Sequence, residues 1–303
     1  WIAAGDIYSA SRQRDRAEKA YRHATTLEEG EPAWVRLARL LMEKSASDAE
    51  AESALRKAVE AVLESGACGP MREVAELLVH HGDDDDALEL LNEALAANED
   101  CYCSLVLQGD IAARRHNEDG AREHFEAALA LNDIGVSALT GLARISAPSE
   151  AQALIGRAME ADPDNPKCLL ARAQLTDREL QFRIEDGSEA LKRDPDLTEA
   201  RLFLAPLEAK RGDIQAAIAH LGAALPELET RRELIPSFVD TSLELARVGL
   251  SNELSALLDS EEGRTVEPLS IALKLDRGES PAVAKEIREV ALDILDQLHA
   301  NER

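Results

Sequence analysis

Small and large apolar residues recur along this chain with the spacing of one helical face. Six segments place a small residue first, a large residue four positions later, and alanine three positions after that. Because positions i, i+4 and i+7 lie on one side of an α-helix, each triplet predicts a helix with a buried stripe. The triplets are Ala17/Tyr21/Ala24, Ala51/Leu55/Ala58, Ala87/Leu91/Ala94, Ala121/Phe125/Ala128, Ala151/Ile155/Ala158 and Ala217/Leu221/Ala224.

These triplets return at a nearly constant interval. A weaker seventh copy ends at Ala190, and the closing alanines are then 34, 36, 34, 30, 32 and 34 residues apart. An upstream stretch with helical spacing precedes each triplet, so the repeating unit is predicted to be a pair of helices. One pair cannot bury its apolar face alone, which predicts that successive pairs stack.

The first helix of the first pair carries a known motif. Trp1, Gly5 and Tyr8 fit the pattern W-x2-L-G-x2-Y, with Ala4 in the leucine position, and Trp34 begins the corresponding helix of the second pair. The chain therefore resembles the tetratricopeptide repeat family over roughly residues 1–230. The resemblance implies an all-α, right-handed superhelical solenoid of antiparallel helix pairs, with about seven to eight repeats. It also implies a concave face lined mainly by the first helix of each pair.

The pattern weakens at three places. In the fifth repeat, Pro148 is expected to end the first helix and Ser149 to cap the second. The sixth repeat has Arg183 and Gly187 where its neighbours have a small and a large apolar residue, which indicates either a shifted helix or ordinary drift between repeats, and we favour drift. After Pro226 the period fades. We therefore divide the chain into a solenoid over 1–230 and a C-terminal degenerate repeat with capping helices over 231–303.

The C-terminal stretch 280–303 begins with Ser280 and Pro281, which suit a helix start. Its apolar residues form a single stripe, which is typical of a terminal cap on a solenoid. The alternative, that this stripe docks on another domain or partner, stays open at this point.

Composition and charge disfavour several classes of partner and indicate a cellular location. The formal net charge is -25, which opposes binding to a phosphate backbone or an anionic membrane. The longest apolar runs are too short to span a bilayer. The four cysteines form no CxxC pair, so a reducing cytoplasm is expected. The chain begins at Trp1 rather than Met, so we expect a piece of a longer protein, and a periplasmic location stays open.

The chain carries none of the common catalytic motifs, such as GxxxxGK[ST], GxGxxG, HExxH or GxSxG. We therefore expect no enzymatic activity and no cofactor. The stretch from Val79 to Leu95 looks at first like a metal site, because two histidines precede four aspartates. We interpret Asp83 instead as the N-cap of a helix and Asp84–Asp86 as its acidic first turn, and we expect no metal.

The resemblance places several charged residues toward the concave groove. The six arginines predicted to bind a partner are Arg36, Arg39, Arg72, Arg114, Arg144 and Arg172. Asp6, Glu76 and Asp110 are expected beside them. Arg114, Arg144 and Arg172 recur in consecutive repeats and could form a cationic strip for an acidic segment. The alternative is that these arginines pair with neighbouring carboxylates of the chain itself.

The leading functional interpretation is a non-catalytic scaffold that holds a protein partner, as a peptide or a helix, in its groove. One branch of the family clamps carboxylate tails with lysine and asparagine, but the matching positions here hold Ile2 and Asp6. Two alternatives stay open: a recruiting or sensing arm of a larger enzyme or ATPase, and an assembly factor of an envelope or secretion complex. Self-association through uncapped ends is a further expectation.

Overall fold

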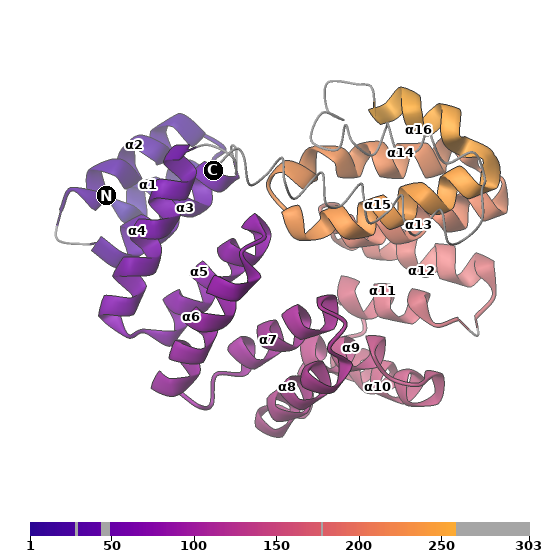
Figure 1. The fold of residues 1–303 in the computed structure, drawn as a ribbon, viewed down its shortest axis with the longest axis horizontal. Helices are drawn as coiled ribbons and strands as arrows, with labels where there is room; N and C mark the ends of the chain where they lie inside the picture. Colours follow the sequence, from indigo (N-terminus) through magenta and orange to yellow (C-terminus); the bar gives the residue numbers. More distant parts are fainter. Residues whose placement is uncertain (28–29, 44–48, 177, 259–303) are drawn as a thin grey trace. The chain divides into compact units, whose positions relative to one another are not determined.

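The computed structural model describes residues 1–27, 30–43, 49–176 and 178–258. Within these ranges the chain forms sixteen α-helices and no strand. The chain divides into two compact units, one from Trp1 to Asp133 and the other from Ile134 onward. Each unit is a stack of helix pairs joined by short turns, and Figure 1 labels the helices in chain order.

The first unit contains four helix pairs. In chain order its helices are α1 (Ile2–Ala10), α2 (Arg14–Thr25), α3 (Gly30–Met42), α4 (Ala49–Ser65), α5 (Cys68–His81), α6 (Asp84–Ala97), α7 (Tyr102–Arg114) and α8 (Glu118–Leu131). Each helix packs on its own pair partner, and α2, α4 and α6 also pack on the first helix of the pair that follows.

The second unit continues the same arrangement. Its elements are α9 (Val136–Arg144), α10 (Pro148–Ala161), α11 (Pro166–Gln174), α12 (Leu180–Arg193), α13 (Thr198–Arg211), α14 (Ile214–Ala224), η1 (Leu225–Glu229), η2 (Arg232–Leu234), α15 (Ile235–Leu245), η3 (Ala246–Leu250) and α16 (Ser251–Leu258). The predicted all-α stack of helix pairs is confirmed, while the right-handed superhelical course stays a prediction. One apolar cluster runs from Leu202 to Leu258. The boundary at residue 230 stays a prediction, and the cap at 280–303 lies outside the described residues.

The triplets supply the core of each pair. In all six complete triplets the alanines and the large residues are at most 6% exposed, as the helical stripe predicts. In the first three pairs most of these side chains join residues of the first helices in one apolar cluster. Burial of this stripe, roughly 25 cal/mol per Å² of apolar surface, is the main force that holds each pair together.

Glycines on the first helices allow the large triplet residues to approach closely. A methyl group built on Gly5 would meet the Tyr21 ring at 2.3 Å, and one built on Gly109 would meet the Phe125 ring at 2.6 Å. Both distances are too short for any side chain, so the aromatic ring occupies the space that a Cβ would need. The small residue of one helix and the large residue of its partner therefore fit each other.

The sixth repeat has the same small–large fit, but there the glycine lies on the second helix of the pair and the large residue lies on the helix that follows. Gly187 lies on α12 in the position of the large residue, and Leu204 of α13 fills the space, at 2.9 Å from where a Cβ would stand. Arg183 takes the first position and donates from Nε to the Ala173 carbonyl at 2.9 Å. Helix α12 therefore keeps the position that the second helices have in the other repeats. This agrees with the interpretation that the sixth repeat differs by ordinary drift in sequence and not by a shifted helix.

The expectation for the fifth repeat is wrong. Helix α10 begins at Pro148 itself, with Ala147 as N-cap and the proline in the first turn. Proline is suited to that position because the first N–H groups of a helix have no intrahelical acceptor. Pro148 therefore starts the second helix, and Ser149 lies within its first turn.

The close approach at Gly109 can be tested with a matched pair of variants. Gly109→Ala should destabilise the protein by about 1–3 kcal/mol, because the new methyl group overpacks against Phe125. Gly156→Ala is the control, since α10 leaves open space at Gly156. The control should be stabilising by about 0.5–1 kcal/mol through helix propensity. Urea unfolding followed by circular dichroism measures both, and equal effects at the two sites would refute the close fit.

Candidate functional site

The acidic run of the third repeat is built into the turn between α5 and α6. Gly82 ends α5 with φ of 95°, and Asp83 takes the N-cap position of α6, as predicted. Its side chain makes no cap hydrogen bond and instead meets Nδ1 of the buried His81 at 2.7 Å. In the seventh repeat the equivalent Asp213 does cap its helix, accepting from the Ala216 amide at 3.0 Å.

The next two aspartates join the third repeat to the fourth. Asp84 accepts from Arg114 at 2.7 Å, and Asp85 lies 2.8 Å from the Arg115 guanidinium. Both arginines stand at the end of α7. Among the described residues, no group of three or more His, Cys, Asp or Glu side chains is arranged to hold a metal ion. The acidic run is therefore one side of an ion-pair cluster between repeats.

Ion pairs also cross the first helices of the first unit. Arg36 on α3 lies 3.3 Å from an Asp6 oxygen of α1 and 3.2 Å from Glu73 of α5. Arg39, one helical turn along, donates to the same Glu73 oxygen at 3.0 Å. Three successive repeats are linked in this way. Because Arg36, Arg39 and Glu73 are each about a third exposed, this charged row remains accessible to a ligand.

Asp6 is held in this row by the core residue beneath it. The Tyr21 hydroxyl donates to Asp6 Oδ1 at 2.8 Å, while its ring packs against Gly5. Burial and this hydrogen bond raise the pKa of Tyr21 to about 12, so the hydroxyl stays protonated and continues to donate. The same side chain thus fills the core and orients a surface carboxylate.

The other predicted arginines have varied surroundings. Arg72 pairs with Glu76 one turn along α5. Arg172, at the end of α11, makes a bidentate pair with Asp186 of α12 at 2.9 and 2.7 Å, and Arg178 reaches the same carboxylate. Arg144 is exposed in the last turn of α9. Arg114 belongs to the first unit and the other two to the second, so the continuous cationic strip stays a prediction.

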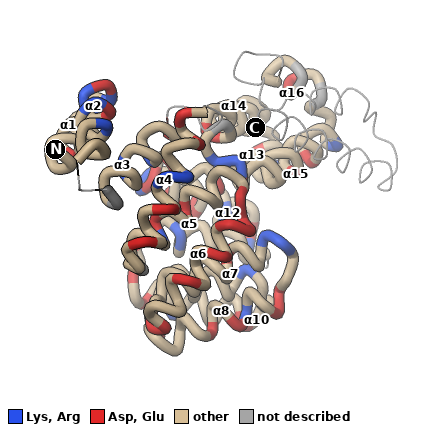
Figure 2. The backbone as a smooth tube through the Cα atoms, turned by 60° about the vertical axis from the view of Figure 1, so that its left-hand side comes forward, with Lys and Arg blue, Asp and Glu red and all other residues tan. Residues whose placement is uncertain are grey.

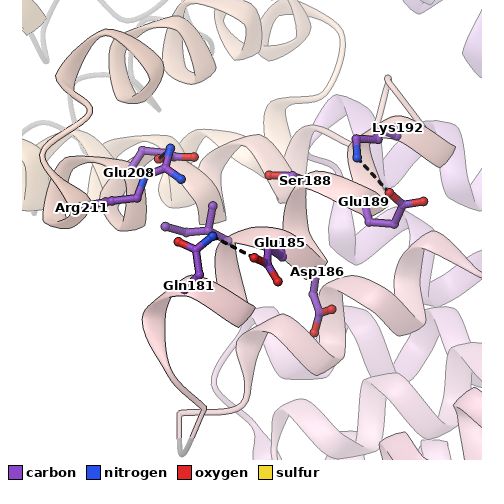
Figure 3. Close-up of a pocket in the computed structure, with 9 residues that line it drawn as sticks. Gln181, Glu185, Asp186, Ser188, Glu189, Lys192, Glu208 and Arg211 are labelled. Atoms are coloured by element: carbon purple, nitrogen blue, oxygen red, sulfur yellow. Dashed lines mark hydrogen bonds and ion pairs between the residues drawn. The ribbon is translucent and has the colours of Figure 1, made fainter.

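A polar pocket of about 410 Å³ in the second unit was not anticipated from the sequence. Figure 3 shows its lining, which comes from α12 and α13. The lining residues are Gln181, Ile184, Glu185, Asp186, Ser188, Glu189, Lys192, Glu208 and Arg211. The signal that could have revealed it is Glu208, which follows the buried Leu204 by four positions and therefore places a carboxylate on a buried stripe.

Glu208 is the most buried carboxylate of this pocket. It is 4% exposed and contacts the Arg211 guanidinium at 2.5 Å. Burial raises its pKa, Arg211 acts in the opposite direction, and Asp213 adds to the rise. Since burial outweighs the single cation, the ionised form of Glu208 is disfavoured in the folded protein relative to the unfolded chain.

The raised pKa of Glu208 predicts a pH-dependent effect of Glu208→Gln. A raised folded-state pKa provides stability below the ordinary glutamate pKa of about 4.3, and this stability is lost as the pH rises through the folded pKa. The variant should therefore raise the melting temperature at pH 7.5, and the gain should vanish near pH 4.

The matched control is Glu189→Gln at the rim of the same pocket. Hydrogen bonds from Lys192 and Arg193 lower the pKa of Glu189, so its neutralisation should give no gain at pH 7.5. Thermal unfolding followed by circular dichroism compares the two variants. A gain of equal size in both would show that removing charge from an acidic chain, rather than burial of Glu208, is the cause.

Comparison with known proteins agrees with the repeat pattern. Models of the tetratricopeptide repeat match residues 73–135 and residues 1–30. A comparison with curated protein sequences finds no match. Such repeats are in general scaffolds for protein–protein interaction. Within the described ranges, no helix combines the length and the apolar character needed to cross a membrane.

Several solved structures are similar in fold. The APC/C hetero-tetramer Cut9–Hcn1 aligns with a TM-score of 0.53 at 13% identity, covering 92% of this chain and 59% of that chain. The thermophilic TPR protein TTC0263 of Thermus thermophilus has a TM-score of 0.48 at 19% identity, covering 59% of this chain and 99% of that chain. At such identities the likeness concerns the fold alone. The chain therefore contains tetratricopeptide repeats at residues 1–30 and 73–135, and the buried triplets and helix pairs continue the same pattern beyond these two matches.

Proposed function

We propose that this protein is a non-catalytic interaction scaffold that holds a peptide or helix of a protein partner along the first helices of its repeats. The observation that supports the proposal is the row of Arg36, Arg39 and Glu73. The two arginines stand on α3 and Glu73 stands on α5, which are the first helices of two successive repeats, and all three side chains are only partly covered. A ligand that lies across the repeats would meet all of them.

The partner is proposed to present a carboxylate-bearing segment. Arg36 and Arg39 share one Glu73 oxygen, and each guanidinium carries five N–H donors, so donors remain for a second carboxylate. Partly exposed ion pairs contribute about 0–1 kcal/mol, so an incoming carboxylate can replace Glu73 at little cost. The intramolecular pairs therefore hold the arginines in position for a ligand.

The test needs a partner identified by affinity capture and mass spectrometry, followed by titration of the purified binding segment. The variant Arg36→Gln/Arg39→Gln should weaken binding at least about tenfold, because hydrogen bonds to charged groups contribute about 1.5–3 kcal/mol. Arg56→Gln is the matched control, since Arg56 is an exposed arginine on α4, a second helix. Its affinity for the segment should equal that of the wild-type protein.

The variant Arg144→Glu tests separately whether the second unit contributes to binding of the partner segment. Reversal at Arg172 is less suitable, because it would place a carboxylate against the buried Asp186. If neither the double variant nor Arg144→Glu changes the affinity of the purified segment, the partner does not bind along the first helices and the proposal is refuted.

A further inference from the structure

The polar pocket between α12 and α13 carries more negative than positive charge. Residues of both signs lie on these two helices, as Figure 2 shows, but four of the lining residues are carboxylates and two are cations. Gln181 and Glu185 line the pocket from α12, and Glu208 and Arg211 line it from α13 (Figure 3). Both helices belong to the second unit, so the walls of the pocket come from one compact part of the chain.

Two of the four carboxylates already have cations beside them. Asp186 is held by Arg172 and Arg178, and Glu189 lies 3.1 Å from the Lys192 ammonium. These ion pairs are complete within the protein, so their carboxylates contribute little attraction for a ligand.

The other two carboxylates are not fully compensated. Glu185 is exposed and accepts from the Gln181 amide at 2.9 Å, and within the described part of the chain it forms no ion pair. Glu208 is buried beside Arg211, but this guanidinium also lies 3.6 Å from an Asp213 oxygen. One cation therefore serves two carboxylates, and negative charge remains in the pocket.

Glu208 also lacks a hydrogen bond. Its Oε2 is shielded from solvent, and the contact with Arg211 is an ion pair without hydrogen-bond alignment, so Oε2 has no donor among the described residues. Buried polar atoms are nearly always hydrogen-bonded. Since burial also raises its pKa, Glu208 destabilises the fold at neutral pH. A carboxylate that destabilises the fold and lines a pocket is a candidate for binding a ligand.

The size and polarity of the pocket restrict its ligand. Its volume of about 410 Å³ lies toward the lower end of the range for ligand sites, which is roughly 300–1,000 Å³. Most such sites have mainly apolar walls, whereas the lining described here includes one apolar residue, Ile184. The described residues also offer no arrangement suited to a metal ion. A single charged side chain therefore fits this space better than an apolar ligand or a metal.

We propose that this pocket binds a cationic side chain, arginine or lysine, of a protein partner. The cation pairs with Glu185 and is attracted by the buried charge of Glu208, while the Ser188 hydroxyl accepts a further hydrogen bond. The site takes the opposite charge from the charged row of the first unit and lies in the other unit. Failure of one proposal therefore does not decide the other.

The experiment titrates the isotope-labelled whole chain with the peptide acetyl-Gly-Arg-Gly-amide and follows backbone amide shifts by NMR. The neutral peptide acetyl-Gly-Gln-Gly-amide is the matched probe. The arginine peptide should cause saturable shifts at α12 and α13 and bind at least about tenfold more tightly than the glutamine peptide, because it forms hydrogen bonds to a charged group. Glu185→Gln should weaken binding of the arginine peptide about tenfold.

The variant Glu208→Gln separates binding from folding. It should weaken the arginine peptide several-fold, because it removes negative charge from the pocket, and it should still raise the melting temperature at pH 7.5. A variant that only damaged the fold would lose stability together with binding.

Glu160→Gln is the matched control, because Glu160 is an exposed glutamate on α10 of the same unit and does not line the pocket. Its variant should bind the arginine peptide like the wild-type protein. Equal weakening by Glu160→Gln and Glu185→Gln would show general attraction to an acidic chain and would overturn the proposal. Equal binding of the two peptides, or no saturable shift with either, would also overturn it.

Titration with spermidine tests whether the cation comes from a free polyamine instead of a protein side chain. Spermidine should bind more weakly than the arginine peptide, since its ammonium groups lack the planar, bidentate geometry of a guanidinium. If spermidine causes saturable shifts at α12 and α13 and the arginine peptide does not, the pocket takes a free polyamine and the proposal is wrong.

Discussion

The fit between a small residue on one helix and a large residue on its partner is the constraint on which the rest of the structure depends. The Tyr21 ring occupies the space beside Gly5, and the Phe125 ring occupies the space beside Gly109. Because these contacts bring paired helices close together, one narrow apolar stripe is enough to hold each pair. In the sixth repeat Leu204 packs into the space at Gly187, so the fit persists although the residues differ.

A narrow core leaves most of the helix surface to charged residues, and the charges are not randomly placed. Carboxylates and arginines pair mainly between helices: Asp84 with Arg114, Glu73 with Arg36 and Arg39, and Asp186 with Arg172. Each pair is weak where it is exposed, but together the pairs fix where guanidinium groups are presented.

The helix pairs could be predicted from the sequence because the triplets repeat with a local spacing. The turn at Gly82 and Asp83 was also predictable, since glycine and aspartate have position-specific roles at helix ends. The partner of Asp83 is His81 rather than the helix amides, and this choice depends on side-chain packing. The carboxylate partners of Arg36 and Arg172 come from other helices, so their identity requires the fold. The pocket around Glu208 combines α12 and α13, and periodicity within one helix could only hint at it.

A double-mutant cycle at Gly109 and Phe125 tests the small–large fit most directly. The free energy of unfolding would be measured for the wild-type protein, Gly109→Ala, Phe125→Leu and the double variant. Leucine leaves room for the new methyl group, so the double variant should be more stable than the sum of the single effects predicts, with a coupling of about 0.5–3 kcal/mol. Additive effects would contradict the account, because they would show that the two side chains do not share the same space.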